Sequence, residues 1–197
     1  MTIRTELGVL DAALDYAARG WAVFPVVAGE KRPMTEHGVK DATTDPATIR
    51  AWWQRWPDAN IGLATGASGL VVVDIDTKNG ARGWESWRDL LAELGLSEPV
   101  TVVCETPSGG GHVYFSTDED LSPSVGKLGD GLDVRAGVSY VVAPPSRLQA
   151  GRYAWAYGCD PGSVEIAPLP ELLAQRIREI SREKPRLTPT NGTAGIT

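Results

Sequence analysis

Hydrophobic and polar positions predict a helix, a strand and a second helix in the N-terminal part of the chain. Apolar residues recur at helical spacing within residues 5–20, and Gly20 is a good helix stop. These apolar positions are Leu7, Leu10, Leu14 and either Ala17 or Ala18. The apolar run WAVFPVV, residues 21–27, predicts a strand, and the polar stretch that follows predicts a loop.

The second helix is predicted to begin after Asp45 and to end at Pro57. Asp45 is a favourable N-cap, and Pro46 suits the first helical position because the N–H that it lacks would be unpaired there anyway. The apolar face of this helix consists of Ile49, Trp52, Trp53 and Trp56. Three tryptophans at this spacing are more typical of core packing than of a platform for stacked bases.

Beyond these elements, short strand-like runs dominate and two further helices are predicted. The strands are expected at residues 71–76, 100–106, 112–117, 132–136, 139–146 and 152–156, and the helices at residues 81–95 and 169–184. Strands first alternate with helices and then follow one another directly. This order favours an α+β fold over a doubly wound parallel sheet.

Composition and charge limit the domain organisation and the partners. The chain has 197 residues with 42% hydrophobic content, and residues 1–184 are predicted to form one folded domain. Residues 185–197 are rich in Pro, Thr and Gly, which predicts a linker or a disordered tail. The net charge of −6 argues against a large nonspecific nucleic-acid surface. Residues 61–137 hold 12 acidic and 5 basic side chains, which is compatible with a cation-dependent site between basic edges, although exposed acidic loops explain part of the excess.

The N-terminal sequence predicts a cytoplasmic protein without membrane contact. It contains acidic residues and no apolar run long enough to cross a bilayer, and no signal peptide is visible. Cys104 and Cys159 form no metal-type spacing with each other or with His37 and His112. A zinc site is therefore not predicted, and both cysteines are expected to be reduced packing residues.

Residues 69–80, GLVVVDIDTKNG, end an apolar strand with two acids. Because side chains alternate along a strand, Asp74 and Asp76 are predicted to share a face with Val72. Two neighbouring carboxylates repel each other unless solvent, a proton or a cation relieves the repulsion. A shared divalent cation is one natural remedy.

Two further segments carry polar residues that suit phosphate chemistry. In TPSGGGHVYF a glycine-rich turn delivers His112 to the start of a strand, and in GDGLDVRAG alternation places Asp133 and Arg135 on one face. Taken alone, the first segment is as typical of a flexible hairpin loop as of a phosphate site. Taken alone, the second is as typical of a salt-bridged surface strand. Together with Asp74 and Asp76 they supply the groups that metal-assisted phosphoryl transfer requires, with Mg²⁺ or Mn²⁺ held by carboxylate oxygens.

These motifs, in this order and with the upstream stretch from EKRP to LATG, resemble the N-terminal prim-pol domain of bifunctional DNA primase/polymerases, in the archaeo-eukaryotic primase superfamily. The resemblance runs from about residue 10 to about residue 173. It implies an antiparallel catalytic sheet similar to an RNA-recognition motif, packed with an additional N-terminal α/β part. The active site would lie in the cleft between them.

The resemblance also implies roles for individual residues. The catalytic set is Asp74, Asp76, His112 and Asp133, of which Asp74, Asp76 and Asp133 would be the metal ligands. The second family motif has a small residue two places before its histidine, here Gly110, and the nearest serine is Ser108. Beyond these family positions, the sequence itself suggests further contacts. The expected nucleotide-binding residues are Ser108, Gly110, His112, Arg135 and Ser146, and the expected nucleic-acid-binding residues are Lys31, Arg32 and Arg147. The segments of Ser146 and Lys31 are equally typical of plain turns.

The resulting expectation is a template-directed nucleotidyl transferase, a DNA primase, a DNA polymerase or both, of a phage- or plasmid-type replication system. Its partners would be nucleoside triphosphates, a single-stranded DNA template and a helicase domain or protein, and we expect a monomer. Two alternatives remain open. One is a non-catalytic replication module that binds nucleic acid, and the other is a metal-dependent glycosyltransferase that uses the two acids of DID.

Overall fold

The structure, a computed structural model, describes residues 8–182 and contains four α-helices and eleven strands within that range. The strands are β1 Val23–Val26, β2 Asn60–Ala64, β3 Leu70–Ile75, β4 Val103–Glu105, β5 Gly111–Ser116, β6 Ser124–Gly129, β7 Leu132–Arg135, β8 Tyr140–Ala143, β9 Arg147–Leu148, β10 Gly151–Arg152 and β11 Ala154–Trp155. The helices are α1 Val9–Ala18, α2 Pro46–Arg55, α3 Gly83–Glu93 and α4 Glu171–Arg182, with short 3-10 helices η1 Gly38–Asp41, η2 Gly66–Ser68 and η3 Lys78–Gly80.

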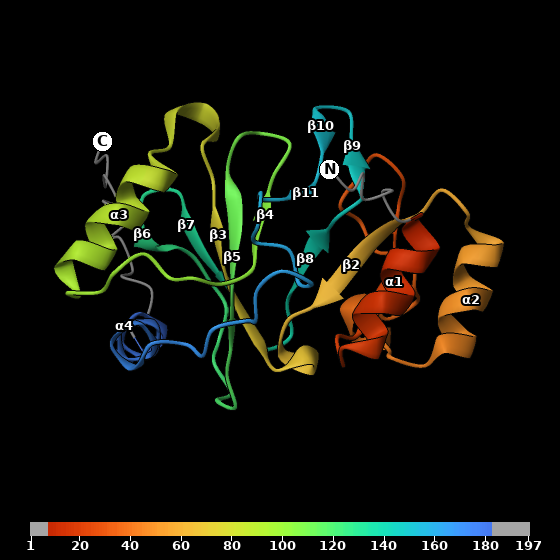
Figure 1. The fold of residues 1–197 in the computed structure, drawn as a ribbon, viewed down its shortest axis with the longest axis horizontal. Coiled ribbons are helices and arrows are strands. Elements are labelled where there is room, and N and C mark those ends of the chain that lie inside the picture. The colour runs from red at the N-terminus through yellow and green to blue at the C-terminus, as the bar shows by residue number, and fades with distance from the viewer. Residues whose placement is uncertain (1–7, 183–197) are drawn as a thin grey trace, which may run out of the picture.

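Two antiparallel sheets lie side by side, and helices cover their outer sides (Figure 1). The larger sheet has six strands in the order β11-β4-β5-β3-β7-β6, and the smaller has three in the order β1-β2-β8. A separate two-stranded ribbon joins β9 to β10. Mixed helices and antiparallel sheets confirm the predicted α+β class. The named strands form no parallel pair, so the parallel nucleotide-binding sheet expected of the glycosyltransferase alternative is not part of the described chain.

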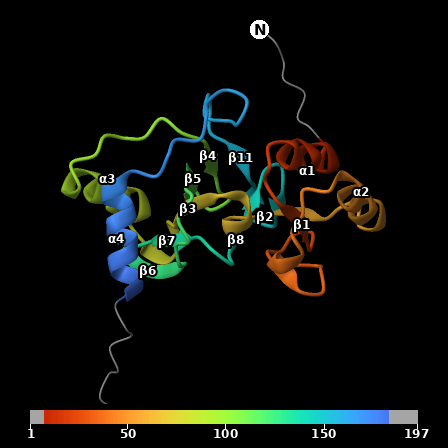
Figure 2. The same ribbon diagram turned by 90° about the horizontal axis from the view of Figure 1, so that it is seen from below.

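The larger sheet separates two hydrophobic cores. On one face, Val71, Val73 and Ile75 of β3 pack with residues of α3 and α4, including Trp87 and Ile177. Figure 2 shows α3 and α4 together on this side, away from α1 and α2. The apolar alternation of β3 therefore faces the helices that follow it in sequence.

The opposite face of the larger sheet packs against the N-terminal part of the chain. Val72 of β3 and Tyr114 of β5 share a buried cluster with residues of α1, α2 and the smaller sheet. Trp53 is buried in this cluster, and Trp52 and Trp56 are partly buried against it, so core packing is confirmed for the tryptophans of α2.

The two N-terminal helices form largely as predicted, with one difference in packing. The Asp45 carboxylate accepts hydrogen bonds from the N–H groups of Ala47 and Thr48, as expected of an N-cap. In α1 the buried residues are Ala12, Ala13, Tyr16 and Ala17, whereas Leu10 and Leu14 are only partly buried. Small alanine side chains let this helix approach the sheet closely, which the leucine spacing did not reveal.

The sequence did not predict β2, β6 or the short ribbon of β9 and β10. β2 is buried along its whole length, so it shows no alternation of apolar and polar residues. It contains Gly62, where a Cβ would lie 2.4 Å from the ring of Phe24. β6 has a register shift between Ser124 and Gly129, and its sequence SVGKLG lacks a clear period.

The predicted strand at residues 139–146 is shorter than expected and belongs to the smaller sheet. β8 spans Tyr140–Ala143 and pairs with β2, so the chain leaves the larger sheet immediately after β7. The strand predicted at residues 152–156 is reduced to β11, on the edge beside β4. Strand pairing, which alternation cannot specify, decides both differences.

Three further sequence predictions concern the cysteines, the membrane and the tail. Cys104 is buried, Cys159 is partly buried, and both are free thiols. None of the helices within residues 8–182 combines the length and the apolar character needed to span a bilayer. The predicted domain end at residue 184 and the tail at residues 185–197 lie outside the described residues.

Ser146, which follows β8, forms a buried hydrogen bond to β2 of the smaller sheet. Its side chain is 1% exposed, and its Oγ accepts a hydrogen bond of 2.9 Å from the N–H of Ile61 in β2. Its own backbone carbonyl accepts a hydrogen bond from the N–H of Tyr153.

We predict that Ser146→Ala lowers the free energy of unfolding by about 1–3 kcal/mol, because the buried N–H of Ile61 loses its acceptor. Urea unfolding followed by circular dichroism measures this change. Ser97→Ala, which alters an exposed serine, serves as the control and should leave stability unchanged. Equal stability of the two variants would show that this hydrogen bond is not needed.

Candidate active site

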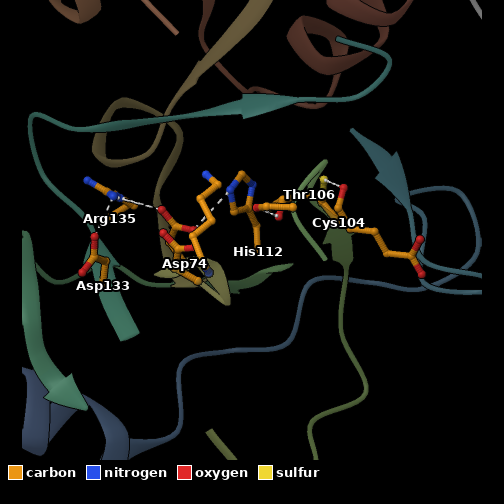
Figure 3. Close-up of polar contacts among 10 residues, drawn as sticks. Asp74, Cys104, Thr106, His112, Asp133 and Arg135 are labelled. Carbon is orange, nitrogen blue, oxygen red and sulfur yellow. Dashed lines mark hydrogen bonds and ion pairs between the residues drawn. The ribbon is translucent and has the colours of Figure 1, made fainter. Parts of the chain in front are cut away.

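The register of β3 brings three candidate residues together. Asp74 of β3 lies directly opposite His112 in β5 and directly opposite Asp133 in β7. Residues opposite each other on neighbouring strands share a face, and the strands are about 4.8 Å apart. Figure 3 shows these side chains directed to the same side of the sheet. The sequence predicted each residue, and the pairing of strands makes them neighbours.

Arg135 connects the two carboxylates. Its Nε and Nη2 donate hydrogen bonds of 3.1 and 3.0 Å to Oδ2 of Asp74, and its Nη2 donates a further bond of 2.8 Å to Oδ2 of Asp133 (Figure 3). Asp133 also accepts a hydrogen bond from the N–H of Gly126. The carboxylates are 20% and 21% exposed, so these charge-assisted bonds lie partly out of water. In this arrangement a guanidinium relieves the repulsion between the acids.

Asp76 occupies a different local setting. β3 ends at Ile75, so Asp76 stands one residue beyond the strand. Its N–H donates to the carbonyl of Gly131, and its Oδ1 accepts a hydrogen bond of 2.9 Å from the N–H of Lys78. The carboxylate therefore closes a turn and is exposed to solvent.

The carboxylates have the chemistry and the positions that suit a divalent cation. Asp74 and Asp133 are adjacent on one sheet face, and the guanidinium of Arg135 pairs with both of them. Carboxylate oxygens are the preferred ligands of Mg²⁺. Within residues 8–182, however, no three His, Cys, Asp or Glu side chains are gathered closely enough to hold a metal ion. Metal binding would therefore require Arg135 to release the acids and Asp76 to turn toward them.

His112 is buried beside Asp74. Its side chain is 3% exposed, its Nε2 lies 3.6 Å from Oδ1 of Asp74, and its Nδ1 has no hydrogen-bond partner. The ring packs against those of Tyr153 and Tyr114, at centroid distances of 5.7 and 6.3 Å. Burial lowers the pKa of His112 to about 4, although the nearby Asp74 acts in the opposite direction. The imidazole is therefore neutral at pH 7 and holds an unused polar atom.

The glycine turn before β5 is shaped by close packing. A Cβ at Gly110 would lie 2.0 Å from the carbonyl oxygen of Ile75, so only glycine lets the turn reach the end of β3. The carbonyl of Ser108 accepts a hydrogen bond from Oγ1 of Thr77, which holds the turn beside Asp76. The Oγ of Ser108 lies 3.3 Å from Oγ1 of Thr106. The turn thus lies at the edge of the site, and binding of nucleotide by Ser108 or Gly110 stays a prediction.

A cavity of about 260 Å³ lies between the two sheets. Asp74, His112 and Arg135 line it from the larger sheet, and Lys31, Tyr140 and Val142 line it from the N-terminal part and β8. The cavity thus lies in the cleft between the two parts of the fold, where the resemblance places the active site. Tyr140 and Tyr153 also line it and were missed by the sequence analysis, which considered their strands only as sheet segments.

The remaining predicted residues lie in two other settings. Ser146 does not line the cavity, and its hydroxyl oxygen accepts a hydrogen bond from the N–H of Ile61. Arg32 is exposed and forms an ion pair of 3.3 Å with Glu30. Arg147 is exposed on the β9–β10 ribbon, directly opposite Arg152. Whether these residues bind nucleotide or nucleic acid stays a prediction.

Acidification should destabilise the fold partly through His112. Its pKa is about 4 in the folded chain and 6.5 in an unperturbed histidine, so the unfolded chain binds the proton first as the pH falls. The stability that neutral His112 contributes is complete above about pH 6.5 and is lost as the pH falls toward 4. Between pH 7 and pH 5 we expect the wild type to lose about 1–2 kcal/mol more unfolding free energy than His112→Asn. Urea unfolding at both pH values tests this, and identical pH dependence of the two proteins would contradict it.

The family of the chain follows from comparison with known proteins. A search of curated proteins found no match. A comparison with protein families matches residues 13–172 to "Bifunctional DNA primase/polymerase, N-terminal". The match includes both sheets and every candidate site residue. The chain therefore belongs to the Prim-Pol family, the N-terminal domains of bifunctional DNA primase/polymerases.

Proposed function

We propose that this domain is a template-directed nucleotidyl transferase of a phage- or plasmid-type replication system, which makes primers, DNA strands or both with Mg²⁺ or Mn²⁺. The observation that carries the proposal is the alignment of Asp74, His112 and Asp133 on adjacent strands, with Asp74 and His112 lining one cavity. The reaction would join a 3′-hydroxyl oxygen to the α-phosphorus of a nucleoside triphosphate and release pyrophosphate. Family membership supports this class of reaction.

Asp74, Asp76 and Asp133 would hold the divalent ions. When bound, these ions would polarise the α-phosphate and neutralise charge that develops on the departing pyrophosphate. Arg135, once released from the acids, would donate hydrogen bonds to phosphate oxygens through its planar guanidinium. Asp74, Asp133 and Arg135 would thus exchange their internal ion pairs for pairs with ligands.

His112 would orient the triphosphate. A neutral imidazole carries one N–H, and from a dry setting between two tyrosine rings it would donate that hydrogen to a phosphate oxygen. Burial keeps the ring neutral at pH 7 and fixed in position, so no conformational freedom is lost when it binds. A helicase domain or protein would act with this domain in replication.

We predict that Asp74→Asn and Asp133→Asn each lower nucleotide incorporation at least about 100-fold, because a neutral amide is a poor ligand for a divalent ion. The measurement is incorporation of labelled nucleotide on single-stranded template, with and without primer, in Mg²⁺, in Mn²⁺ and in chelator. Circular dichroism should show an intact fold, since asparagine still accepts a bond from Arg135. Asp58→Asn, which changes an exposed acid that does not line the cavity, is the matched control.

Undiminished incorporation by Asp76→Asn would remove that residue from the proposed ligand set. If the wild type incorporates no nucleotide under any condition yet binds single-stranded DNA, the non-catalytic replication module becomes the better description.

Template binding should be weak and only mildly dependent on salt, because the chain has a net charge of −6. We expect roughly two to four phosphate contacts, each adding a slope of about −0.7 to log affinity against log salt. Fluorescence anisotropy with labelled single-stranded DNA over a salt series measures this slope. Arg147→Gln should make the slope shallower by about 0.7 without changing nucleotide affinity. A steep slope in the wild type, unaltered in this variant, would place the DNA surface elsewhere.

A further inference from the structure

The loop after β1 places two neighbouring cations in different surroundings. Lys31 lines the 260 Å³ cavity together with Asp74, His112 and Arg135. Both side chains are exposed, but Arg32 does not line this cavity and pairs with Glu30. The sequence analysis grouped both residues as contacts for nucleic acid, but the fold separates them.

The backbone of this loop is held from two elements of the smaller sheet. The hydroxyl of Tyr140 in β8 donates a hydrogen bond of 2.6 Å to the carbonyl of Lys31. The side-chain amide of Asn60 in β2 donates to the carbonyl of Glu30, and the N–H of Val27 donates to the carbonyl of Arg32. The position of the Lys31 Cα relative to the cavity is therefore fixed, although its side chain can still adjust at the cavity rim.

The charges around Lys31 leave it available to an anion. Burial and the nearby Lys78 lower the pKa of Lys31, while Asp74 and Asp76 act in the opposite direction. Within residues 8–182 its ammonium forms no ion pair. The two acids that raise its pKa already accept hydrogen bonds, Asp74 from Arg135 and Asp76 from the N–H of Lys78. Lys31 thus lines the cavity and forms no ion pair within the described residues.

We propose that Lys31 binds the triphosphate of the incoming nucleotide from the side of the smaller sheet, opposite His112 and Arg135. Three donor groups from three separate segments would then surround one polyanion: the loop after β1, the start of β5 and the end of β7. A compact ammonium suits phosphate oxygens as a point charge. Nucleotide binding would thereby tie the smaller sheet to the larger one. The inference rests on the proposed function and assigns one more residue to the same site.

The test compares Lys31→Gln with Arg32→Gln, because the two variants remove the same charge from adjacent positions. Affinity is measured without DNA, in Mg²⁺, for a deoxynucleoside triphosphate, for inorganic tripolyphosphate and for the nucleoside alone. Lys31→Gln should weaken binding of the triphosphate and of tripolyphosphate by a similar factor, roughly tenfold or more, and leave nucleoside binding unchanged. Arg32→Gln should leave all three affinities unchanged. Lys31→Arg should retain most of the triphosphate affinity, because guanidinium also binds phosphate.

Wild-type triphosphate affinity in Lys31→Gln would overturn the inference, and so would an equal loss of nucleoside affinity or failure of the wild type to bind tripolyphosphate. The two proposals fail separately. A wild type that incorporates nucleotide while Lys31→Gln binds it normally removes the role of Lys31 alone. A wild type that binds triphosphate through Lys31 but incorporates nothing keeps that role and removes the transferase activity.

Discussion

The antiparallel register of β3 with its two neighbours is the constraint on which the candidate site depends. Asp74 meets His112 on one side and Asp133 on the other only in this register. A slip of one residue would turn the polar positions of one strand to the opposite face. Val73 and Ile75 oppose such a slip, because each would leave the core that it forms with α3 and α4. The packing on one face of the sheet thus determines the chemistry on the other.

The acids on this face repel each other, and a neighbouring arginine of the same fold relieves the repulsion. Asp74 and Asp133 lie opposite each other, and like charges in that position destabilise a sheet. Arg135 follows Asp133 by two residues and therefore shares its face, where it pairs with both carboxylates. In the folded chain Arg135 thus compensates the charges of these carboxylates without any ligand. A divalent ion and a triphosphate would replace this pairing with an equivalent one, so ligand exchange need not leave a buried charge unpaired.

The second sheet turns this polar face into an enclosed site. After β7 the chain leaves the larger sheet and enters the smaller sheet at β8, where Tyr140 lines the cavity. The β9–β10 ribbon continues from it, touches the loop after β1 through a bridge between Gly29 and Leu148, and approaches the glycine turn at Pro107. These contacts add to the buried cluster that Val72 and Tyr114 share with the smaller sheet. The cavity wall is therefore assembled from segments far apart in the chain. A ligand that touches both sides would stabilise their relative position.

The sequence by itself determined the class of fold, most helices and the identity of Asp74, His112, Asp133 and Arg135 as the polar residues of strand faces. These features follow from local periodicity, from capping and turn residues, and from the order of motifs that marks the family. It did not reveal β2, whose complete burial removes the alternation that identifies a strand. It also could not separate Lys31 from Arg32, or show that Ser146 bonds to Ile61. Those outcomes belong to the tertiary structure, because strand pairing and the packing of two sheets depend on contacts between residues far apart in sequence, and no local pattern encodes which of them will meet.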